Sequence, residues 1–232
     1  MATILALIFP LGISAHPLGN FTISHFSRIE ISTDRLKIHY VVDMAEIPTF
    51  QELQAIHVGG ERSPSSAEFD RYVEGKATQY AEGLFLTIEG TRVPLQVVNK
   101  KVQTIEGGGG LQTLRVECDF TGTIPAGAGP TSHLHFEDLN HKERLGWREM
   151  VVVAGSGISI FDSTAFGTAV TNELKAYPLD MLTAPLDERV ADLAFTQGPL
   201  PPGSTALGTR EGRPVEQSRD RLAELIAVPE IT

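Results

Sequence analysis

The stretch AHPLGNFTISHFSRIEISTDRLKIHYVVDMAEIPTFQ, residues 15–51, decides the fold that the rest of the chain adopts. Apolar side chains occupy alternate positions in two of its segments, residues 21–31 and 36–44. A period of two residues is typical of a β-strand with one buried face. The sequence therefore predicts two strands joined by a tight turn at Thr33-Asp34, which form a hairpin.

Two independent patterns give the same register for this hairpin. On the apolar face Ile29 lies opposite Ile38, and on the polar face Glu30 lies opposite Lys37 as a pair of opposite charges. A slip of one residue would turn one of the apolar faces toward solvent. We therefore expect this register in the folded protein.

Two helices are predicted to follow the hairpin. Thr49 and Glu52 have the spacing of a capping box and indicate the start of the first helix. Ser65 or Ser66 opens the second helix, which ends at Gly83. Further strands are predicted at residues 84–89, 93–103, 111–120, 131–137 and 148–153. The expected fold is mainly β (α+β): an antiparallel, immunoglobulin-like β-sandwich with a small helical insertion near residues 49–83 and a C-terminal helix.

The two ends of the chain differ from this central domain, which we expect to span residues 16–197. Residues 1–15 are nearly all apolar and end in Ile13-Ser14-Ala15, as a cleaved signal peptide does. Because no Lys or Arg precedes the apolar run, three alternatives stay open: a start farther upstream, a weak signal, or a buried strand. Residues 198–232 begin with GPLPPG, which indicates a linker, and continue as an amphipathic helix.

Composition excludes several classes of function. The formal net charge of −10 argues against nucleic-acid binding, which usually needs a basic face. The single Cys118 excludes an internal disulfide and a cysteine-rich metal site. The chain has no nucleophile elbow, zinc-protease helix, phosphate-binding loop or dinucleotide fingerprint. We therefore do not expect an enzyme.

Four runs of sequence indicate a family. They are HPLGNFTISHFSRIEI from His16, DMAEIPTFQ from Asp43, Gly146-Trp147-Arg148-Glu149, and NELKAYP from Asn172. Together they resemble the N-terminal extracytoplasmic region of bacterial nickel/cobalt transporters, often called high-affinity nickel transporters. The resemblance covers most of residues 15–227. It implies an exported domain at the periplasmic or extracellular face of the membrane, with a membrane permease as partner. The permease helices are not in this sequence, and no transmembrane helix beyond the signal peptide is expected.

His16 is the first candidate metal ligand. Cleavage after Ala15 would make His16 the mature N-terminus, where its amine and imidazole chelate one ion, preferably nickel, cobalt or copper. The resemblance points the same way, since an N-terminal histidine after cleavage recurs in that family. In the alternative interpretation His16 only follows a cleavage site and frays into solvent.

His133, His135 and Glu137 form the second candidate metal site. They occupy alternate positions of one predicted strand, so their side chains share a face, with the two imidazoles about 7 Å apart. The intervening Leu134 and Phe136 then face the core. Two imidazoles and a carboxylate suit a transition metal. The alternative is an ordinary polar outer face.

The other histidines give weaker signals. His25 falls on the apolar face of its strand, which predicts a buried, hydrogen-bonded imidazole. His39 lies on a polar face, about 13 Å from Asp43 along the strand, too far for both to bind one ion. The sequence thus favours an exported metal-binding or accessory domain that is not itself a permease. A metal-free docking module on a membrane partner is the alternative, and a hydrolase is a more remote one.

Overall fold

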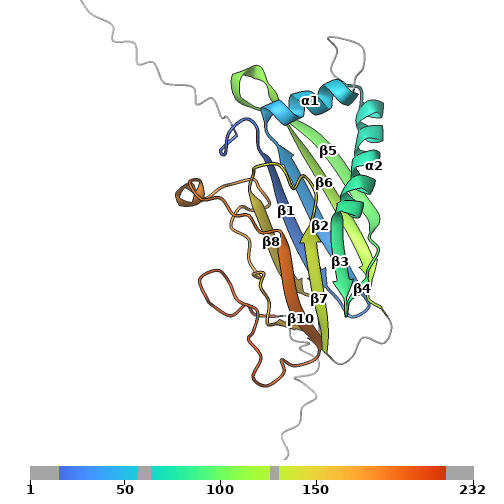
Figure 1. Ribbon diagram of the computed structural model, residues 1–232, viewed down its shortest axis with the longest axis vertical. Helices are drawn as coiled ribbons and strands as arrows, with labels where there is room; N and C mark the ends of the chain where they lie inside the picture. The colour runs from blue at the N-terminus through green and yellow to red at the C-terminus, as the bar shows by residue number, and fades with distance from the viewer. Residues whose placement is uncertain (1–15, 57–63, 126–130, 218–232) are drawn as a thin grey trace, which may run out of the picture.

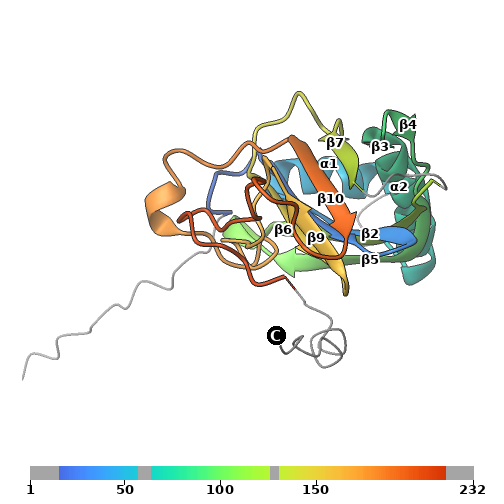
Figure 2. The ribbon, with the colours of Figure 1, turned by 90° about the horizontal axis from the view of Figure 1, so that it is seen from below.

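The computed structural model describes residues 16–56, 64–125 and 131–217, which form a sandwich of two five-stranded sheets. The first sheet has the strand order β5-β6-β2-β1-β8, and the second has the order β4-β3-β7-β10-β9. Helix α1 crosses one end of the sandwich and helix α2 runs along its side (Figure 1). Figure 2 shows strands of the two sheets as successive layers. The predicted fold class, a mainly β sandwich with a helical insertion, is confirmed.

The elements have the following bounds. The strands of the first sheet are β5 Gln96–Glu106, β6 Gln112–Thr123, β2 Arg35–Met44, β1 Ile23–Ile31 and β8 Arg148–Ala154. Those of the second are β4 Thr91–Arg92, β3 Leu84–Ile88, β7 Thr131–Asp138, β10 Val190–Gln197 and β9 Ile158–Phe161. The helices are α1 Glu46–Ile56 and α2 Ser66–Gly83, with short 3-10 turns η1 Gly108–Gly110 and η2 Leu179–Met181.

The hairpin of β1 and β2 has the predicted register. Ile29 pairs with Ile38, and both side chains are fully buried in the core between the sheets. Glu30 pairs with Lys37, and their charged groups lie 4.0 Å apart on the outer face. The hairpin is confirmed, because burial of one face and charge pairing on the other require the same alignment.

One strand pair differs from the antiparallel pattern. β8 lies parallel to β1, because the chain crosses from β7 in the second sheet to the free edge of β1 in the first. Gly146 lies at this crossing, where an added Cβ atom would come within 2.0 Å of the Ile23 carbonyl oxygen. Only glycine permits so close an approach of the two backbones.

The structure corrects the start of α1 and confirms α2. Helix α1 begins at Glu46, not at Thr49, whose amide already donates to the Ala45 carbonyl as a residue of the first turn. Pro48 is tolerated there because its missing N–H falls in the first turn, where amides have no partner within the helix. Helix α2 starts after Ser65 as predicted, with the Glu68 carboxylate accepting from the Ser65 amide at 2.7 Å.

The stretch after β10, expected to be a linker, packs on the sandwich as far as residue 217. Leu207 is buried, and its amide donates to Ile160 in β9. Residues 1–15 and 218–232, which hold the predicted signal peptide and most of the predicted C-terminal helix, lie outside the described residues. No helix within residues 16–217, the gaps apart, has the length and apolar character needed to span a membrane.

A buried polar network joins the two sheets. Asp138, at the end of β7, faces His25 of β1, Tyr40 of β2 and Arg148 of β8, and all four are at most 3 % exposed. The Asp138 carboxylate lies 2.6 Å from His25 Nδ1 and 3.3 Å from the Arg148 guanidinium, and it accepts from the Tyr40 hydroxyl at 3.1 Å. The buried, hydrogen-bonded state predicted for His25 is confirmed.

The protonation of Asp138 fixes which groups in this network donate and which accept. Burial raises the pKa of Asp138, but His25 and Arg148 outweigh it and hold the pKa below its ordinary value, so the carboxylate is ionised and only accepts. His25 therefore carries its proton on Nδ1, and its Nε2 accepts from Nδ1 of His141 at 3.1 Å. Burial lowers the pKa of His25, and it lowers that of His141 to about 3.

Replacing Arg148 with methionine should destabilise the fold strongly. The substitution leaves the Asp138 charge buried without its guanidinium partner, which typically costs about 3–5 kcal/mol. The free energy of unfolding, measured by urea denaturation, gives the loss. Arg35→Met, which removes the exposed pair with Asp34, is the matched control and should change stability little. Equal losses in the two variants would contradict this role for Asp138.

Stability should fall as the pH drops below about 6.5, because His25 and His141 take up protons more readily in the unfolded chain. Each histidine contributes a slope of up to about 1.4 kcal/mol per pH unit while only the unfolded state is protonated. His141→Gln should therefore make the decline between about pH 6 and pH 4 shallower. Urea denaturation across this range measures the slope, and an unchanged slope would contradict the assignment.

Candidate metal centre

The sequence runs that carry the family resemblance meet on the outer face of the first sheet. There Trp147 packs in a small second core with Phe26, Val41 and Leu174. The Trp147 ring lies 5.5 Å from the ring of Tyr177, and the Tyr177 ring lies 6.0 Å from that of His16. His16, the first residue of the predicted mature chain, therefore packs against the ring of Tyr177, which in turn packs against that of Trp147.

An unusual turn positions Tyr177. Asn172, Glu173 and Leu174 have φ angles of 47°, 59° and 65°, which is the left-handed region. This conformation costs about 1–2 kcal/mol per residue, so other contacts must hold it. Leu174 is buried, and the Glu173 carboxylate accepts from Arg28 of β1 at 2.6 Å. The turn is thus fixed from both its apolar and its charged side.

The His16 side chain is held by two contacts from β1 and β2. It is 8 % exposed, with Nδ1 3.1 Å from the Thr22 hydroxyl and Nε2 3.4 Å from the Asp43 carboxylate. Hydrogen bonds from the Ala45 amide to Thr22 and from the Ile47 amide to Asn20 hold the N-terminal segment beside the end of β2. In this chain the His16 side chain therefore packs against β1 and β2 and is buried.

The hydrogen bonds around Thr22 favour one tautomer of the neutral His16 ring. The single Thr22 hydroxyl proton is donated to the Gly19 carbonyl at 2.9 Å, so toward the imidazole this oxygen accepts. In the neutral ring Nδ1 then carries the proton and Nε2 presents a lone pair. This Nε2 is buried and has no hydrogen-bond partner. A bare nitrogen facing a carboxylate oxygen is an arrangement that a cation between them stabilises.

Glu46, the first residue of α1, is a second carboxylate near His16. Its side chain is shielded from solvent, and Oε1 accepts from the Gly108 amide at 2.8 Å. Burial raises the pKa of Glu46, but the amides of Gly108, Glu46 and His16 outweigh it and bring the pKa below its ordinary value. The carboxylate is therefore ionised, while its Oε2 is buried and has no hydrogen-bond partner.

The carboxylates near His16 were not predicted from the sequence. Asp43 lies beside His16, whereas the sequence pattern relates it only to His39. The hairpin register pairs Ser24 with Asp43, and that signal was available from the sequence. The return of the chain from His16 to Thr22, which brings the imidazole to Asp43, depends on tertiary contacts that periodicity does not encode.

The chelate predicted for the amine and imidazole of His16 stays a prediction. The Nδ1 atom of His16, the imidazole nitrogen that can share an ion with the amine of the same residue, faces Thr22. The donor left over is Nε2, together with Asp43 Oδ2. Within the described ranges no three or more His, Cys, Asp or Glu side chains are grouped as a complete metal site. His16 and Asp43 thus offer two ligands, with other positions left to water or a partner.

His133 and His135 have the predicted orientation, but they do not face one common metal position. Leu134 and Phe136 are buried, while His133 and His135 lie on the outer face of β7, as does the half-buried Glu137. Each imidazole contacts its own carboxylate: His133 Nδ1 lies 3.1 Å from Glu89, and His135 Nδ1 lies 2.7 Å from Asp192. These partners hold the two rings separately.

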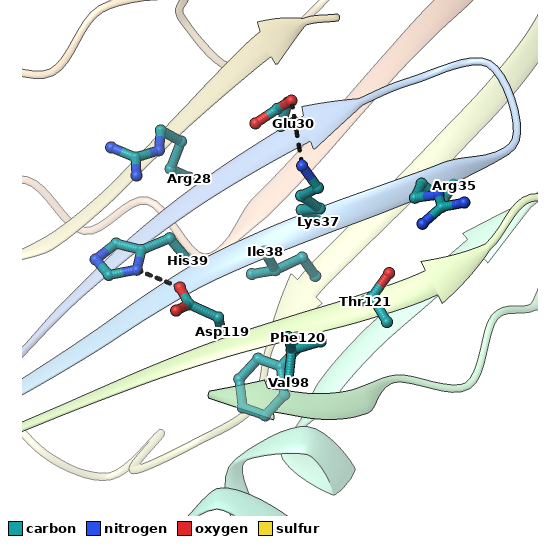
Figure 3. A pocket seen from close by; sticks show the side chains of 10 residues that line it. All are labelled: Arg28, Glu30, Arg35, Lys37, Ile38, His39, Val98, Asp119, Phe120 and Thr121. Carbon is teal, nitrogen blue, oxygen red and sulfur yellow. Dashed lines mark hydrogen bonds and ion pairs between the residues drawn. The ribbon is translucent and has the colours of Figure 1, made fainter. Parts of the chain in front are cut away.

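A hollow of about 360 Å³ lies over the outer face of β1, β2 and β6 (Figure 3). Its basic and acidic side chains lie in pairs, and dashed lines in Figure 3 mark two of these contacts. The pairs are Lys37–Glu30, His39–Asp119, Arg28–Glu173 and Arg35–Asp34. Because every cation here already has an anionic partner, the hollow gives no clear signal for a charged ligand.

The tautomer of His16 is directly measurable. In metal-free protein at a pH where the imidazole is neutral, we expect the proton on Nδ1, because Thr22 only accepts from it. Long-range ¹H–¹⁵N correlation spectra distinguish the two tautomers. Thr22→Val removes the acceptor and should shift the population toward the Nε2–H form. A neutral His16 with its proton on Nε2 in the unmodified protein would contradict the assignment.

Comparisons with known proteins do not identify a family for this chain. No protein-family model matches the chain, and no curated protein shows a significant match to it. The function is therefore inferred from the site itself and from the resemblance of the sequence runs that build it.

Proposed function

We propose that the chain is an exported accessory domain that binds a divalent transition ion between His16 and Asp43 and serves a membrane permease of the nickel/cobalt type. The observation that carries the proposal is the pair of facing donors: a buried Nε2 without a hydrogen-bond partner, 3.4 Å from Asp43 Oδ2. Two adjacent ligand atoms that each lie about 2.1 Å from an ion are about 3.4 Å apart in tetrahedral geometry and about 3.0 Å apart in the square-planar geometry of nickel and copper. An ion therefore fits between them with little rearrangement.

The donor types favour nickel, cobalt or copper. The site offers imidazole nitrogen and carboxylate oxygen, and the single cysteine does not contribute. Cys118 is buried in the core between the sheets, and burial raises the pKa of its thiol to about 12. With no thiolate available, affinity should follow the general order for nitrogen and oxygen ligands, in which copper binds most tightly and cobalt less tightly than nickel.

Calorimetric titration of the protein that begins at His16 with Ni²⁺, Co²⁺, Cu²⁺ and Zn²⁺ tests the proposal. Binding of one ion is expected, and His16→Ala and Asp43→Asn should each weaken it about tenfold or more, because each removes a ligand. Affinity should also fall at lower pH, because protons compete for the imidazole nitrogen.

Two variants serve as controls for this titration. Asp119→Asn makes the same change of charge on the same sheet, beside His39, and should leave affinity unchanged. The double variant His133→Ala, His135→Ala tests the strand pair. Loss of binding in that double variant, with full binding in His16→Ala, would assign the metal to the strand pair. Absence of binding in all proteins would reject a metal site.

The surface around the site favours a second candidate, a metal-free docking module. Phe21, Phe50, Leu145 and Leu179 are all at least half exposed. Phe21 adjoins Thr22, and Phe50 lies one turn after Glu46 in α1. The Leu145 carbonyl accepts from the Ile23 amide, and Leu179 follows Tyr177 by two residues. Exposed apolar groups near one end of a sandwich suit contact with a membrane partner. The titration above separates this candidate from the first.

A further inference from the structure

A short loop, residues 139–145, closes over the buried network where the chain leaves β7. We propose that His141 is an acid-sensitive latch of this loop: as a neutral ring it holds the loop on His25, and its uptake of a proton releases the loop. The inference does not rest on metal binding. It differs from the loss of global stability predicted above, because the loop opens while the two sheets stay folded.

Backbone hydrogen bonds fix the two ends of the loop. The Leu139 amide donates to the Gly83 carbonyl at 2.9 Å, and the Leu145 carbonyl accepts from the Ile23 amide at 2.9 Å. Between these ends the Arg144 amide donates to the carbonyl of His141, which is a turn within the loop itself. The ends can therefore act as hinges for the residues between them.

Side chains attach the middle of the loop to the sandwich. The Arg148 guanidinium donates to the carbonyls of Asn140 and His141 at 3.0 and 2.7 Å. The Asn140 side chain donates to the Tyr80 carbonyl at 3.1 Å, and the Asn140 amide donates to the Asp138 carboxylate at 2.9 Å. Segments without a ladder of backbone hydrogen bonds open at a lower free energy than the strands of a sheet. The loop can therefore open before the sandwich unfolds.

The ring of His141 completes this attachment in its neutral state. Its Nδ1 lies 3.1 Å from His25 Nε2, and the two ring centroids are 5.2 Å apart. Because Asp138 takes the Nδ1 proton of His25, the Nε2 atom of His25 accepts and His141 donates. The backbone of His141 has a φ of 45°, which is uncommon for a residue other than glycine, so contacts of this kind must hold it.

An added proton on His141 finds no carboxylate of its own. Asp138, the carboxylate that acts on this ring, already serves His25, Arg148 and Tyr40. Burial lowers the pKa of His141 to about 3, and His25 and the cations Lys76 and Arg148 lower it further against the pull of Asp138. The charged and titratable groups that face the two rings are Tyr40 of β2, Lys76 and Tyr80 of α2, Asp138 of β7, Arg148 of β8, and Arg189 just before β10.

Acid should therefore shift the loop toward its open form. In the open loop the His141 ring is in water, where its pKa returns to about 6.5, so protons bind the open form more tightly than the closed one. Between pH 6.5 and pH 4.5 the ratio of open to closed loops should rise about 50-fold. Opening withdraws two carbonyl acceptors from Arg148 and uncovers one side of the Tyr80 ring, which lies 5.7 Å from that of His141.

Hydrogen exchange of single amides, followed by NMR, tests the latch in the unmodified protein. After correction for the intrinsic rates, exchange at the Asn140 and Arg144 amides should rise about 50-fold from pH 6.5 to pH 4.5. Low concentrations of urea should not change exchange at these two amides, because a local opening exposes little new surface. Amides of β2, in the middle of the first sheet, should depend on urea as global unfolding does.

Two histidine variants assign the response to one ring. His141→Asn removes the imidazole, and asparagine tolerates the left-handed backbone at this position, so the acid response should fall below about threefold. His39→Asn, which removes the ring paired with Asp119 on the outer face of the first sheet, should keep the full response. A 50-fold response that persists in His141→Asn would overturn the proposal.

The unmodified protein decides the question even if His141→Asn folds poorly. The same urea dependence at the loop amides and at those of β2 would show that the loop opens only when the protein unfolds. A rise of less than about threefold in loop exchange between pH 6.5 and pH 4.5 would show that no proton is taken up on opening. Either result would reject the latch.

Discussion

The fold depends on one buried ionised group, the Asp138 carboxylate, which lies where the two sheets meet. It takes a hydrogen bond or an ion pair from β1, β2 and β8, so the second sheet is tied to three strands of the first. Arg148, its guanidinium partner, also donates to the carbonyl groups of Asn140 and His141 and thereby fixes the crossing between the sheets. Apolar burial alone would tolerate sliding of one sheet over the other, whereas these directed contacts permit one arrangement.

The contacts between Asp138 and Arg148 also position the residues around the candidate metal centre. Trp147 directly precedes Arg148 and is therefore placed on the opposite face of the first sheet, where it packs against Tyr177. Tyr177 in turn contacts the ring of His16. Arg148, Trp147, Tyr177 and His16 thus form one continuous group, from the inter-sheet network to the N-terminal histidine. In this account several of them support the site without binding metal.

Local patterns predicted much of this structure. Alternation gave the register of Ile29 with Ile38 and the outward direction of His133 and His135, because both follow from the pleat of a strand. The start of α1 was misplaced, since Thr49 and Glu52 imitate a capping box inside a helix that begins at Glu46. The parallel pairing of β8 and the meeting of His16 with Asp43 arise from long-range packing, which short-range periodicity does not encode.

The central claim is that His16 and Asp43 share one divalent ion. The most direct measurement is a crystal structure of the processed protein with Ni²⁺, in which anomalous scattering locates the metal. The account predicts one strong peak about 2.1 Å from both His16 Nε2 and an Asp43 carboxylate oxygen. A peak between His133 and His135 would contradict it. The absence of any peak near His16 in crystals held at saturating Ni²⁺ would contradict it as well.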